Sequence, residues 1–406
     1  MAEEKKTKKQ VEAPNPVIYE LARVFARIFM CFTGGFKCTG DTLPKEGPLL
    51  VLASHQGMLD FVPVGLALRG RRVRFVITDR FMRGGMLSRF LRWMAVIPKT
   101  QFQADARSIS QMLRTLRAGG TVGLFPAGQT SMCGVPGEVS PVITKLVKKA
   151  GANVVAVQLH GSFFAKSRFI RGIHRCPIHA NVKLLFTPEQ LKEASEEEIY
   201  DAIYGSIYYD EFTWQQMNQI KVRSKQRADG YDKVLYACPN CASLYTIQSK
   251  ENTVRCTVCG VEANVGEDMR LYWEDDMALP ENLRDWYFRQ QWAAEEALMH
   301  PGYVLEAKVT VMDFLDGQEI PVGQGKLMVD REGIRYSGSL MGEAEHSFSL
   351  RRDQLSGLVA KPGCFVELYH SELGRLLRFQ MENPAQATHV KVLCEAKADS
   401  FEDEEL

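Results

Sequence analysis

The sequence lacks any long apolar segment: no stretch of 18 or more uncharged apolar residues occurs among its 406 residues, so we predict no membrane-spanning helix. A secretory signal is not expected, because the charged run at residues 2–9 has no apolar core directly after it. An excess of one charge is lacking too, since the net charge is +1. What is present is an ordinary globular composition, with 45% hydrophobic and 24% charged residues, in a chain long enough for about two or three domains.

A short apolar run at residues 48–53 is followed by His55 and, five residues further on, by Asp60. The run predicts a buried parallel strand, and open α/β sheets place their ligands at the carboxyl ends of such strands. An imidazole takes a proton from an alcohol near neutral pH when a neighbouring group orients it and stabilises the cation. We therefore interpret His55 as a general base and Asp60 as its orienting carboxylate and as the N-cap of a helix. The alternative is structural: a histidine that caps a strand and an aspartate that caps a helix.

A second apolar run, residues 121–125, leads into a turn rich in proline and glycine, which brings backbone amides close to a ligand. Between the two runs, residues 69–99 hold nine basic side chains and one acid, a local charge of +8, interleaved with bulky apolar residues. This mixture suits an anionic lipid surface or the phosphates of an acyl carrier. The alternative is a solvated helix face beside core positions. The nine basic residues are Arg69, Arg71, Arg72, Arg74, Arg80, Arg83, Arg89, Arg92 and Lys99.

These motifs, in this order, resemble those of the glycerolipid acyltransferase family, whose type members are 1-acylglycerol-3-phosphate acyltransferases. His55 and Asp60 match the first family motif, His-x4-Asp, and residues 80–99 resemble the second. Apolar residues 153–158 resemble the fourth. The resemblance spans roughly residues 16–190 and implies an α/β fold, the αβα domain of glycerol-3-phosphate acyltransferases. The third family motif, Phe-Pro-Glu-Gly-Thr-Arg-Ser, is matched at Phe125, Pro126, Gly128 and Ser131.

The resemblance implies direct acyl transfer without a covalent enzyme intermediate. His55 would deprotonate the acceptor hydroxyl, Asp60 would stabilise the imidazolium, and the alkoxide would attack the thioester of acyl-CoA or acyl carrier protein. A nucleophilic thiolate at Cys133, just past the third motif, is the alternative mechanism. A non-catalytic membrane-binding scaffold on a degenerate acyltransferase fold is the alternative function.

Two positions of the third motif depart from the family, since Ala127 replaces a Glu and Thr130 replaces an Arg. The resemblance implies that this Glu and Arg hold the glycerol phosphate of the acceptor, and neither Gln129 nor Thr130 reproduces the bidentate bonds of an arginine. Either Arg80 or Lys99 supplies a point charge instead, or the acceptor is a lyso-lipid other than lysophosphatidate. The substrate-binding candidates are Arg80, Lys99, Phe125, Pro126, Gly128, Gln129, Thr130 and Ser131.

Residues 16–36 predict an amphipathic helix, because Glu20, Arg23 and Arg27 share one face among apolar residues. We interpret this helix as one that lies in the membrane interface, and a helix packed on the domain is the alternative. We thus expect a peripheral protein on the cytoplasmic face of the cell membrane. Its expected partners are the phospholipid surface, a lyso-lipid acceptor and the acyl donor. The upstream lysines that would meet anionic lipid are Lys5, Lys6, Lys8 and Lys9.

The ten cysteines include two Cys-x2-Cys pairs, with fourteen residues between the pairs. Four thiolates close a tetrahedral shell and leave no open position, so we predict a structural zinc ion in a zinc ribbon. Two disulfides are the alternative, and they need an oxidising compartment that nothing else in the sequence indicates. Because cations near the pairs are sparse, we expect no nucleic-acid partner. The predicted zinc ligands are Cys238, Cys241, Cys256 and Cys259.

The rest of the chain changes from helical to strand periodicity. Residues 280–299 predict a helix in which Trp292 lies opposite the other large apolar residues, so we expect this helix to be covered on both sides. From residue 302 onward the period is two, with a hairpin turn at residues 330–333. Seven strands and a final helix at 384–397 resemble a pleckstrin-homology or GRAM-like barrel, which would bind lipid headgroups or a protein, or support the catalytic domain. The strand candidates are 304–311, 325–330, 333–338, 346–350, 355–361, 364–370 and 375–380.

The composition shifts along the chain predict six segments. Each boundary falls where the hydrophobic pattern, the charge or the cysteine content changes. The segments are a basic tail with the interfacial helix (1–35), the acyltransferase catalytic domain (36–230), the zinc ribbon (231–266), a Trp-rich helical connector (267–301), the β-rich domain (302–398) and an acidic tail (399–406).

Overall fold

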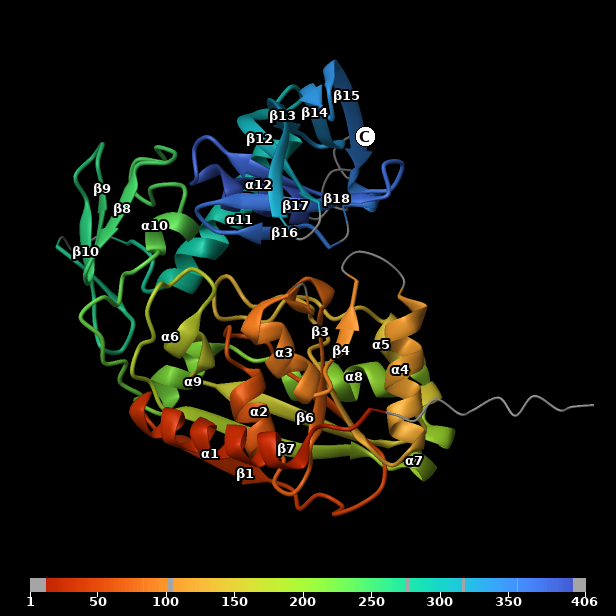
Figure 1. Ribbon diagram of the computed structural model, residues 1–406. Coiled ribbons are helices and arrows are strands. Elements are labelled where there is room, and N and C mark those ends of the chain that lie inside the picture. The colour runs from red at the N-terminus through yellow and green to blue at the C-terminus, as the bar shows by residue number, and fades with distance from the viewer. Residues whose placement is uncertain are drawn as a thin grey trace, which may run out of the picture. The chain divides into compact units, whose positions relative to one another are not determined.

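The computed structural model of the chain describes residues 12–82, 84–100, 105–274, 278–315, 318–355 and 357–396. Its backbone divides into two compact units, and Figure 1 labels most of their elements. The predicted basic tail with its lysines and the predicted acidic tail lie outside the described residues. Among the described residues, no helix is both long and apolar enough to cross a membrane. The first unit comprises Met1–Thr130, Pro136–Ser162 and Pro177–Tyr209, and the second comprises Ser131–Val135, Phe163–Cys176 and Asp210–Leu406.

The first unit is built on one seven-stranded sheet. Its strands are β1 (Phe36–Gly40), β2 (Leu49–Ala53), β3 (Val73–Thr78), β4 (Ile97–Lys99), β5 (Thr121–Leu124), β6 (Asn153–His160) and β7 (Ile178–Phe186). Their order across the sheet is β1-β7-β6-β2-β5-β3-β4. The pair β6–β7 is antiparallel, and the other neighbouring pairs are parallel. The carboxyl ends of β6, β2, β5, β3 and β4 therefore lie along one edge, where a parallel sheet forms its ligand sites.

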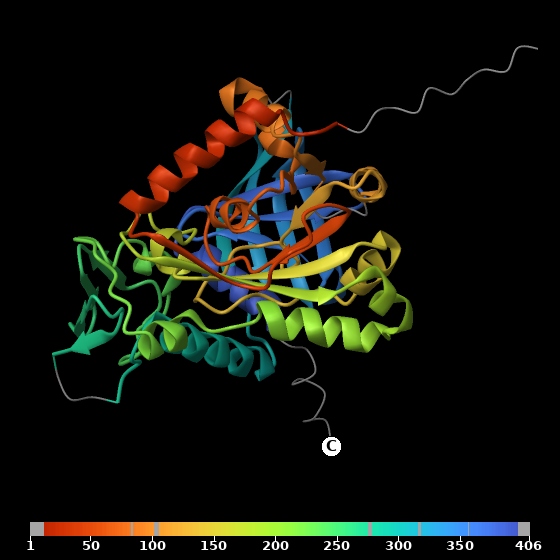
Figure 2. The ribbon, with the colours of Figure 1, turned by 90° about the horizontal axis from the view of Figure 1, so that it is seen from below.

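Helices cover both faces of this sheet. They are α1 (Pro16–Phe32), α2 (Phe61–Ala67), α3 (Gly85–Trp93), α4 (Ala106–Arg117), α5 (Val142–Ala150), α7 (Pro188–Glu193) and α8 (Glu196–Ile207). The side chains of β2 alternate between two cores: Leu50 and Leu52 pack with α4, α5, α7 and α8, whereas Leu49 and Val51 pack with α2. In Figure 2 the red helix α1 and the green helix α8 lie on opposite sides of β6 and β7. This three-layer arrangement confirms the predicted αβα fold class.

Helix α1 is shorter at its end than the sequence pattern predicts. It begins where the side chain of Asn15 accepts hydrogen bonds from the amides of Val17 and Ile18, with Pro16 in the first turn. It ends at Phe32 rather than at residue 36, because the glycines at 34 and 35 adopt positive φ angles of 122° and 103°. The chain then enters β1 directly.

The second unit contains two antiparallel sheets. A four-stranded sheet has the order β11-β10-β9-β8, and a seven-stranded sheet has the order β15-β14-β13-β12-β18-β17-β16. The strands of the smaller sheet are β8 (Ile247–Lys250), β9 (Thr253–Cys256), β10 (Glu262–Val265) and β11 (Leu271–Trp273). Those of the larger one are β12 (Leu305–Leu315), β13 (Gln318–Val329), β14 (Gly333–Leu340), β15 (Glu343–Arg351), β16 (Val359–Lys361), β17 (Phe365–His370) and β18 (Arg375–Met381). The helices are α9 (Glu211–Met217), α10 (Tyr231–Val234), α11 (Leu283–Met299) and α12 (Gln386–Glu395), and α6 (Ser162–Lys166) begins on the last residue of a first-unit segment.

The seven strands and the final helix predicted after residue 302 are present, but their lengths differ from the prediction. Strands β12 and β13 pair from Leu305–Val329 to Leu315–Gln318, whereas the pattern predicts no strand between residues 311 and 325. Pro321 and Gly323 weaken the strand pattern there, and pairing with β12 makes the segment extended. The predicted strand 355–361 shrinks to β16, behind a 3₁₀ turn at Arg352–Gln354. The likeness to a pleckstrin-homology barrel and the predicted segment boundaries stay predictions.

Helix α11 has one apolar face that is buried and one aromatic residue that is not. Leu283, Trp286 and Tyr287 are buried, as the periodicity predicts. Trp292 is 78% exposed, so the expectation that this helix is covered on both sides is wrong. A helical pattern shows that a side chain lies opposite the core, but it does not show whether another element covers it, and single exposed aromatic residues are common on protein surfaces.

Candidate active site and cysteine cluster

His55 and Asp60 are in direct contact at the carboxyl end of β2. The Nδ1 atom of His55 lies 2.8 Å from Oδ2 of Asp60, which is fully buried. The same oxygen accepts the backbone amides of Gln56 at 2.7 Å and Gly57 at 2.9 Å. Because a carboxylate oxygen only accepts, Nδ1 carries the proton, and Nε2 of a neutral imidazole is left as the acceptor. The pair thus has the geometry of a base and its orienting group.

The predicted helix cap at Asp60 is wrong in its chemistry. Asp60 does precede α2, but its side chain makes no capping hydrogen bond. Its Oδ1 accepts the hydroxyl of Ser162, so both oxygens are already engaged. Ser162 follows β6, and the sequence interpretation missed it because its only sign is a position just after the apolar run that resembles the fourth motif. Gly57 permits this approach, because a Cβ there would lie 2.5 Å from the carbonyl oxygen of Ser162.

The third motif reaches the first through an aromatic stack. The rings of His55 and Phe125 are stacked, with centroids 4.3 Å apart and an interplanar angle of 22°. Phe125 follows β5, which neighbours β2, so the sheet order brings the two motifs together. Phe125 in turn stacks on Phe75, and Phe75 contacts Phe61 edge to face. One face of the imidazole is therefore covered by apolar rings, while its side chain keeps 21% exposure.

The other residues of the third motif are held inside its turn. Gly128 has a φ of +69°, and its amide donates to the carbonyl of Phe125 at 3.0 Å, so this amide is not free to bind a ligand. Thr130 is 8% exposed, with its hydroxyl 4.0 Å from the sulfur of Met58. Pro126 and Gln129 are half-buried in the same turn.

Ser131 belongs to the second unit, and its hydroxyl is occupied locally. It donates to the carbonyl of Val135 at 2.6 Å and accepts the amides of Cys133 at 3.2 Å and Gly134 at 2.8 Å. These bonds close a turn. Its predicted role in substrate binding gains no support from this arrangement.

Arg80 lies just past the carboxyl end of β3 and Lys99 is the last residue of β4, so both belong to the same sheet edge as His55. Neighbouring strands lie about 4.8 Å apart, so β3 is about 10 Å and β4 about 14 Å from β2 across the sheet. The side chain of Arg80 is half-buried and that of Lys99 is exposed. Arg80 is therefore the nearer of the two candidate point charges.

Part of the positive charge of residues 69–99 is buried inside the fold and does not lie on the surface. Arg71 is buried and donates to the carbonyls of Pro44 and Gly47. Arg74 is buried as well and donates to the carbonyl of Ala95 and to Thr115. Composition does not reveal this, because a guanidinium with five donors can be satisfied by backbone oxygens inside a fold. Arg83 lies outside the described residues.

Cys133 is buried, with a side chain that is 6% exposed, and burial raises the pKa of its thiol to about 12. A thiol with such a pKa holds almost no thiolate at neutral pH. Both features count against the alternative mechanism through a covalent thiolate.

Part of the chain is similar in sequence to known acyltransferases. Residues 35–165 match the family model described as Acyltransferase, a range that contains the His55–Asp60 pair and the third motif. The protein carries an acyltransferase domain. A 1-acyl-sn-glycerol-3-phosphate acyltransferase of Bacillus subtilis (strain 168) is 21% identical over 156 residues, which are 38% of this chain and 77% of that protein. The crystal structure of the 1-acyl-sn-glycerophosphate acyltransferase PlsC from Thermotoga maritima matches with a TM-score of 0.41 and 15% identity, over 47% of this chain and 76% of that chain. The family model and the Bacillus subtilis relative confirm the family resemblance and the assignment as an acyltransferase enzyme.

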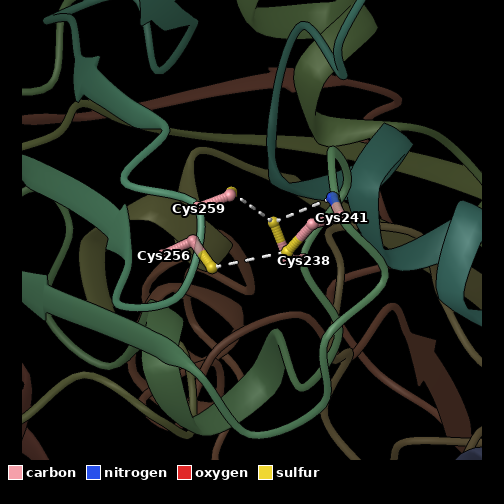
Figure 3. Close-up of side chains that lie close together, drawn as sticks. All are labelled: Cys238, Cys241, Cys256 and Cys259. Carbon is pink, nitrogen blue, oxygen red and sulfur yellow. Dashed lines mark hydrogen bonds between the residues drawn. The ribbon is translucent and has the colours of Figure 1, made fainter.

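The second unit of the acyltransferase brings its four paired cysteines into one cluster, which Figure 3 shows. The sulfurs of Cys238 and Cys259 are 3.6 Å apart, those of Cys241 and Cys256 are 3.8 Å apart, and all four lie within 4.8 Å of one another. A tetrahedral zinc ion with zinc–sulfur distances of about 2.3 Å needs sulfurs about 3.8 Å apart. The donor set and its spacing therefore fit a metal ion, and all ten cysteines are free rather than disulfide-bonded.

The two cysteine knuckles share one backbone geometry. In each, the residue after the second cysteine donates its amide to the carbonyl of the first cysteine at 3.1 Å. That residue has a positive φ in both: 56° at Ala242 and 78° at Gly260. Glycine adopts this conformation without strain, whereas alanine does not. The two knuckles are thus alike in shape and unequal in strain.

Hydrogen bonds to sulfur and to the flanking backbone support the cluster. Burial acts to raise the pKa of the Cys256 thiol, and hydrogen bonds from the Thr246 hydroxyl and nearby amides act to lower it. Beside the first knuckle, Gln290 of α11 accepts the amides of Tyr236 at 2.6 Å and Ala237 at 2.9 Å. The predicted ribbon is therefore joined to the helix that follows it.

Proposed function

We propose that the acyltransferase moves a fatty acyl group from acyl-CoA or acyl carrier protein to the hydroxyl of a lyso-glycerophospholipid or a related lyso-lipid. The observation that carries this proposal is the His55–Asp60 pair, held by three further hydrogen bonds to the carboxylate at the ligand-binding edge of the sheet. The named activity of the Bacillus subtilis relative supports the same class of acceptor.

The pair supports direct transfer in two proton steps. Nε2 of His55 takes the proton of the acceptor hydroxyl, and the oxygen forms a bond to the thioester carbonyl carbon. The carbon–sulfur bond then breaks, and the departing thiolate takes the proton from the imidazolium. Asp60 stabilises the imidazolium between these steps, because its Oδ2 faces the protonated Nδ1.

Arg80 is our candidate for a phosphate on the acceptor. Thr130 is buried against Met58 and offers no cation, and β4 places Lys99 one strand further from His55 than Arg80. An acceptor without a phosphate beside the reacting hydroxyl is the alternative that Ala127 and Thr130 favour. The variants Arg80→Gln and Lys99→Gln separate these cases when each is assayed with phosphorylated and non-phosphorylated acceptors.

We also infer a membrane-facing surface on the first unit, formed by α1 and α3. Six large apolar residues of α1 form a stripe that is at least half exposed, while Tyr19 and Met30 on the other side are buried. In α3, Met86 and Leu87 are exposed beside Arg89 and Arg92, and the amide of Asn15 bonds to the carbonyl of Trp93. Apolar residues next to cations suit an anionic phospholipid surface, as at the cytoplasmic face of the cell membrane. The stripe consists of Val17, Leu21, Val24, Phe25, Ile28 and Phe32.

A vesicle-binding comparison tests this surface. Phe25 is 70% exposed on α1, and Trp292 is 78% exposed on α11 in the second unit. If α1 inserts, Phe25→Ser lowers the affinity for anionic vesicles by at least about tenfold, since burying a phenylalanine stabilises by about 2 kcal/mol. Trp292→Ser, a matched loss of an exposed aromatic residue, leaves the affinity unchanged. Equal effects of the two variants would contradict the assignment.

For the cysteine cluster we infer one structural zinc ion. Its four thiolates fill a tetrahedral shell, so the ion supplies folding free energy and has no open position for a substrate. For the β12–β18 sheet, the pairing of its cations counts against headgroup binding. Several of its cations are already paired with carboxylates, among them Arg335 with Asp330 and Arg375 with Asp313.

The deciding experiment is acyl transfer by the purified chain in the presence of lipid vesicles. Labelled acyl-CoA and acyl carrier protein are offered with a panel of lyso-lipid acceptors, and His55→Ala is the control. Transfer that disappears in the control establishes the function, and the preferred acceptor identifies the substrate class. A folded, zinc-loaded chain that binds vesicles and transfers nothing would instead establish the scaffold, the second candidate, which the substituted third motif favours.

A further inference from the structure

The carboxylate of Asp60 is bonded more completely than an orienting group needs. Its Oδ2 receives the imidazole of His55 and two backbone amides, and its Oδ1 receives the hydroxyl of Ser162. Three of these four donors come from the same loop as Asp60. Ser162 follows the carboxyl end of β6, 102 residues further along the chain than Asp60.

We propose that Ser162 is a positioning residue for the transfer reaction, which acts by fixing the Asp60 carboxylate against His55. This inference rests on the proposed function. Three of the hydrogen bonds end on the same atom, Oδ2. These bonds alone would let the carboxylate rotate about Oδ2. The Ser162 hydroxyl holds the second oxygen and removes this freedom.

The surroundings of Ser162 show why the contact matters. Asp60 is fully buried and Ser162 is 4% exposed, so removal of the hydroxyl leaves a carboxylate oxygen that is shielded from bulk water. A buried carboxylate oxygen without a donor is costly and draws the side chain toward another partner. Gly57 packs against the same serine, because a Cβ at position 57 would lie 2.7 Å from its hydroxyl oxygen. Ser162 is therefore packed closely against both Asp60 and Gly57.

A positioning role has a kinetic signature. Ser162 is buried beneath the motif, so its removal acts on the imidazolium that forms during transfer and leaves acceptor binding alone. A hydrogen bond from a neutral donor to a charged group corresponds to about 10- to 100-fold in rate. We expect Ser162→Ala to lower kcat by this factor with KM within about twofold of the wild-type value.

The first test compares three variants by transfer assay and thermal unfolding. Ser162→Ala lacks the hydroxyl, Ser162→Thr keeps it, and Ser108→Ala removes a buried hydroxyl that bonds to the carbonyl of Asp105 instead. We expect Thr to restore kcat to within about threefold of wild type and the Ser108 variant to keep full activity. An alanine variant with wild-type kcat would overturn the proposal, as would a raised KM with unchanged kcat.

The second test does not depend on any acceptor. Nitrogen-15 NMR of the histidine rings reports which ring nitrogen carries the proton, and the His55 signal is identified by its loss in His55→Ala. In wild type the proton is on Nδ1. Ser162→Ala should give a mixture of tautomers, and an unchanged Nδ1 signal would overturn the proposal. If wild type transfers no acyl group, the proposed function fails, yet this spectrum still decides whether Ser162 fixes the pair.

Discussion

The His55–Asp60 pair and the four-cysteine cluster are both found from short spacings in the sequence, but the fold holds them in different ways. The pair is fixed by groups from three strands of one sheet: its own loop after β2, Phe125 after β5 and Ser162 after β6. The cluster is formed by two knuckles beside short strands, and its four sulfurs lie within 4.8 Å of one another. The first site is thus held by the core of a sheet, whereas we propose that the second is held by the ion that its thiols bind.

The largest effect that tests this contrast is removal of the metal. If zinc replaces a core, Cys256→Ser or strong chelation should unfold the segment from Tyr236 to Trp273, because structural zinc contributes on the order of 10 kcal/mol. Elemental analysis should give one zinc per chain in wild type and much less in the variant, and limited proteolysis should then cut this segment. Cys31→Ser, an exposed cysteine outside the cluster, is the control. A chelated chain that resists protease would show that the segment is self-supporting.

The catalytic pair should respond in the opposite manner, with lost activity and a retained fold. Asp60→Asn should lower kcat by about 10³- to 10⁴-fold, because the amide no longer stabilises the imidazolium. Thermal unfolding of this unit should change by only a few degrees. Asp41→Asn, which affects a carboxylate that accepts the amide of Leu184 away from the site, should keep activity. A decrease of less than tenfold for Asp60→Asn would remove the pair from the mechanism.

A smaller effect concerns the contact of α12 with the segment from Tyr236 to Trp273. The strength of this contact should depend on pH. His389 stacks on Tyr236 and bonds to the hydroxyls of Tyr245 and Tyr303, and burial lowers its pKa to about 4. In the unfolded chain His389 therefore binds a proton near pH 6.5, whereas in the folded chain it binds one only near pH 4. The contribution to stability is complete above pH 6.5 and is lost as the pH falls, by about 3 kcal/mol at most.

Urea unfolding at pH 7.5 and pH 5 measures this loss. His389→Gln should make the unfolding free energy of the second unit less dependent on pH in this interval, and His346→Gln, which changes a more exposed histidine of the same unit, should not. Equal pH dependence in wild type and His389→Gln would show that other groups cause the acid sensitivity.

The smallest effect distinguishes the two knuckles. Ala242→Gly should stabilise the zinc-loaded chain by about 0.5–1 kcal/mol, because alanine is strained at a φ of 56°. Gly260→Ala should destabilise it by a similar amount. Thermal unfolding of both variants at equal zinc loading measures the difference. A stabilising Gly260→Ala would mean that the knuckles differ in more than this one residue.

What the sequence could predict follows the distance between contacting residues. His55 and Asp60 are five residues apart, and each cysteine pair closes on itself, so local spacing was sufficient for both sites. The αβα class and the strands after residue 302 follow from hydrophobic periodicity. Ser162, the stack of Phe125 on His55 and the burial of Arg71 were not predictable, because each depends on which strands become neighbours. The expectation that Trp292 is covered was wrong for a related reason, since a hydrophobic pattern does not show what lies on the outer face of a helix.

The pairing of β1 with β7 has a consequence for the order of events in folding. Phe36 pairs with Ile178, about 140 residues later in the chain. At synthesis rates of about 5–20 residues per second, β1 leaves the ribosome roughly 10–30 s before its partner strand exists. A closure over such a distance is slow compared with helix formation, so α1 forms while its sheet is incomplete. We expect the nascent chain to pass through a state in which the apolar stripe is presented and the edge of the sheet is open.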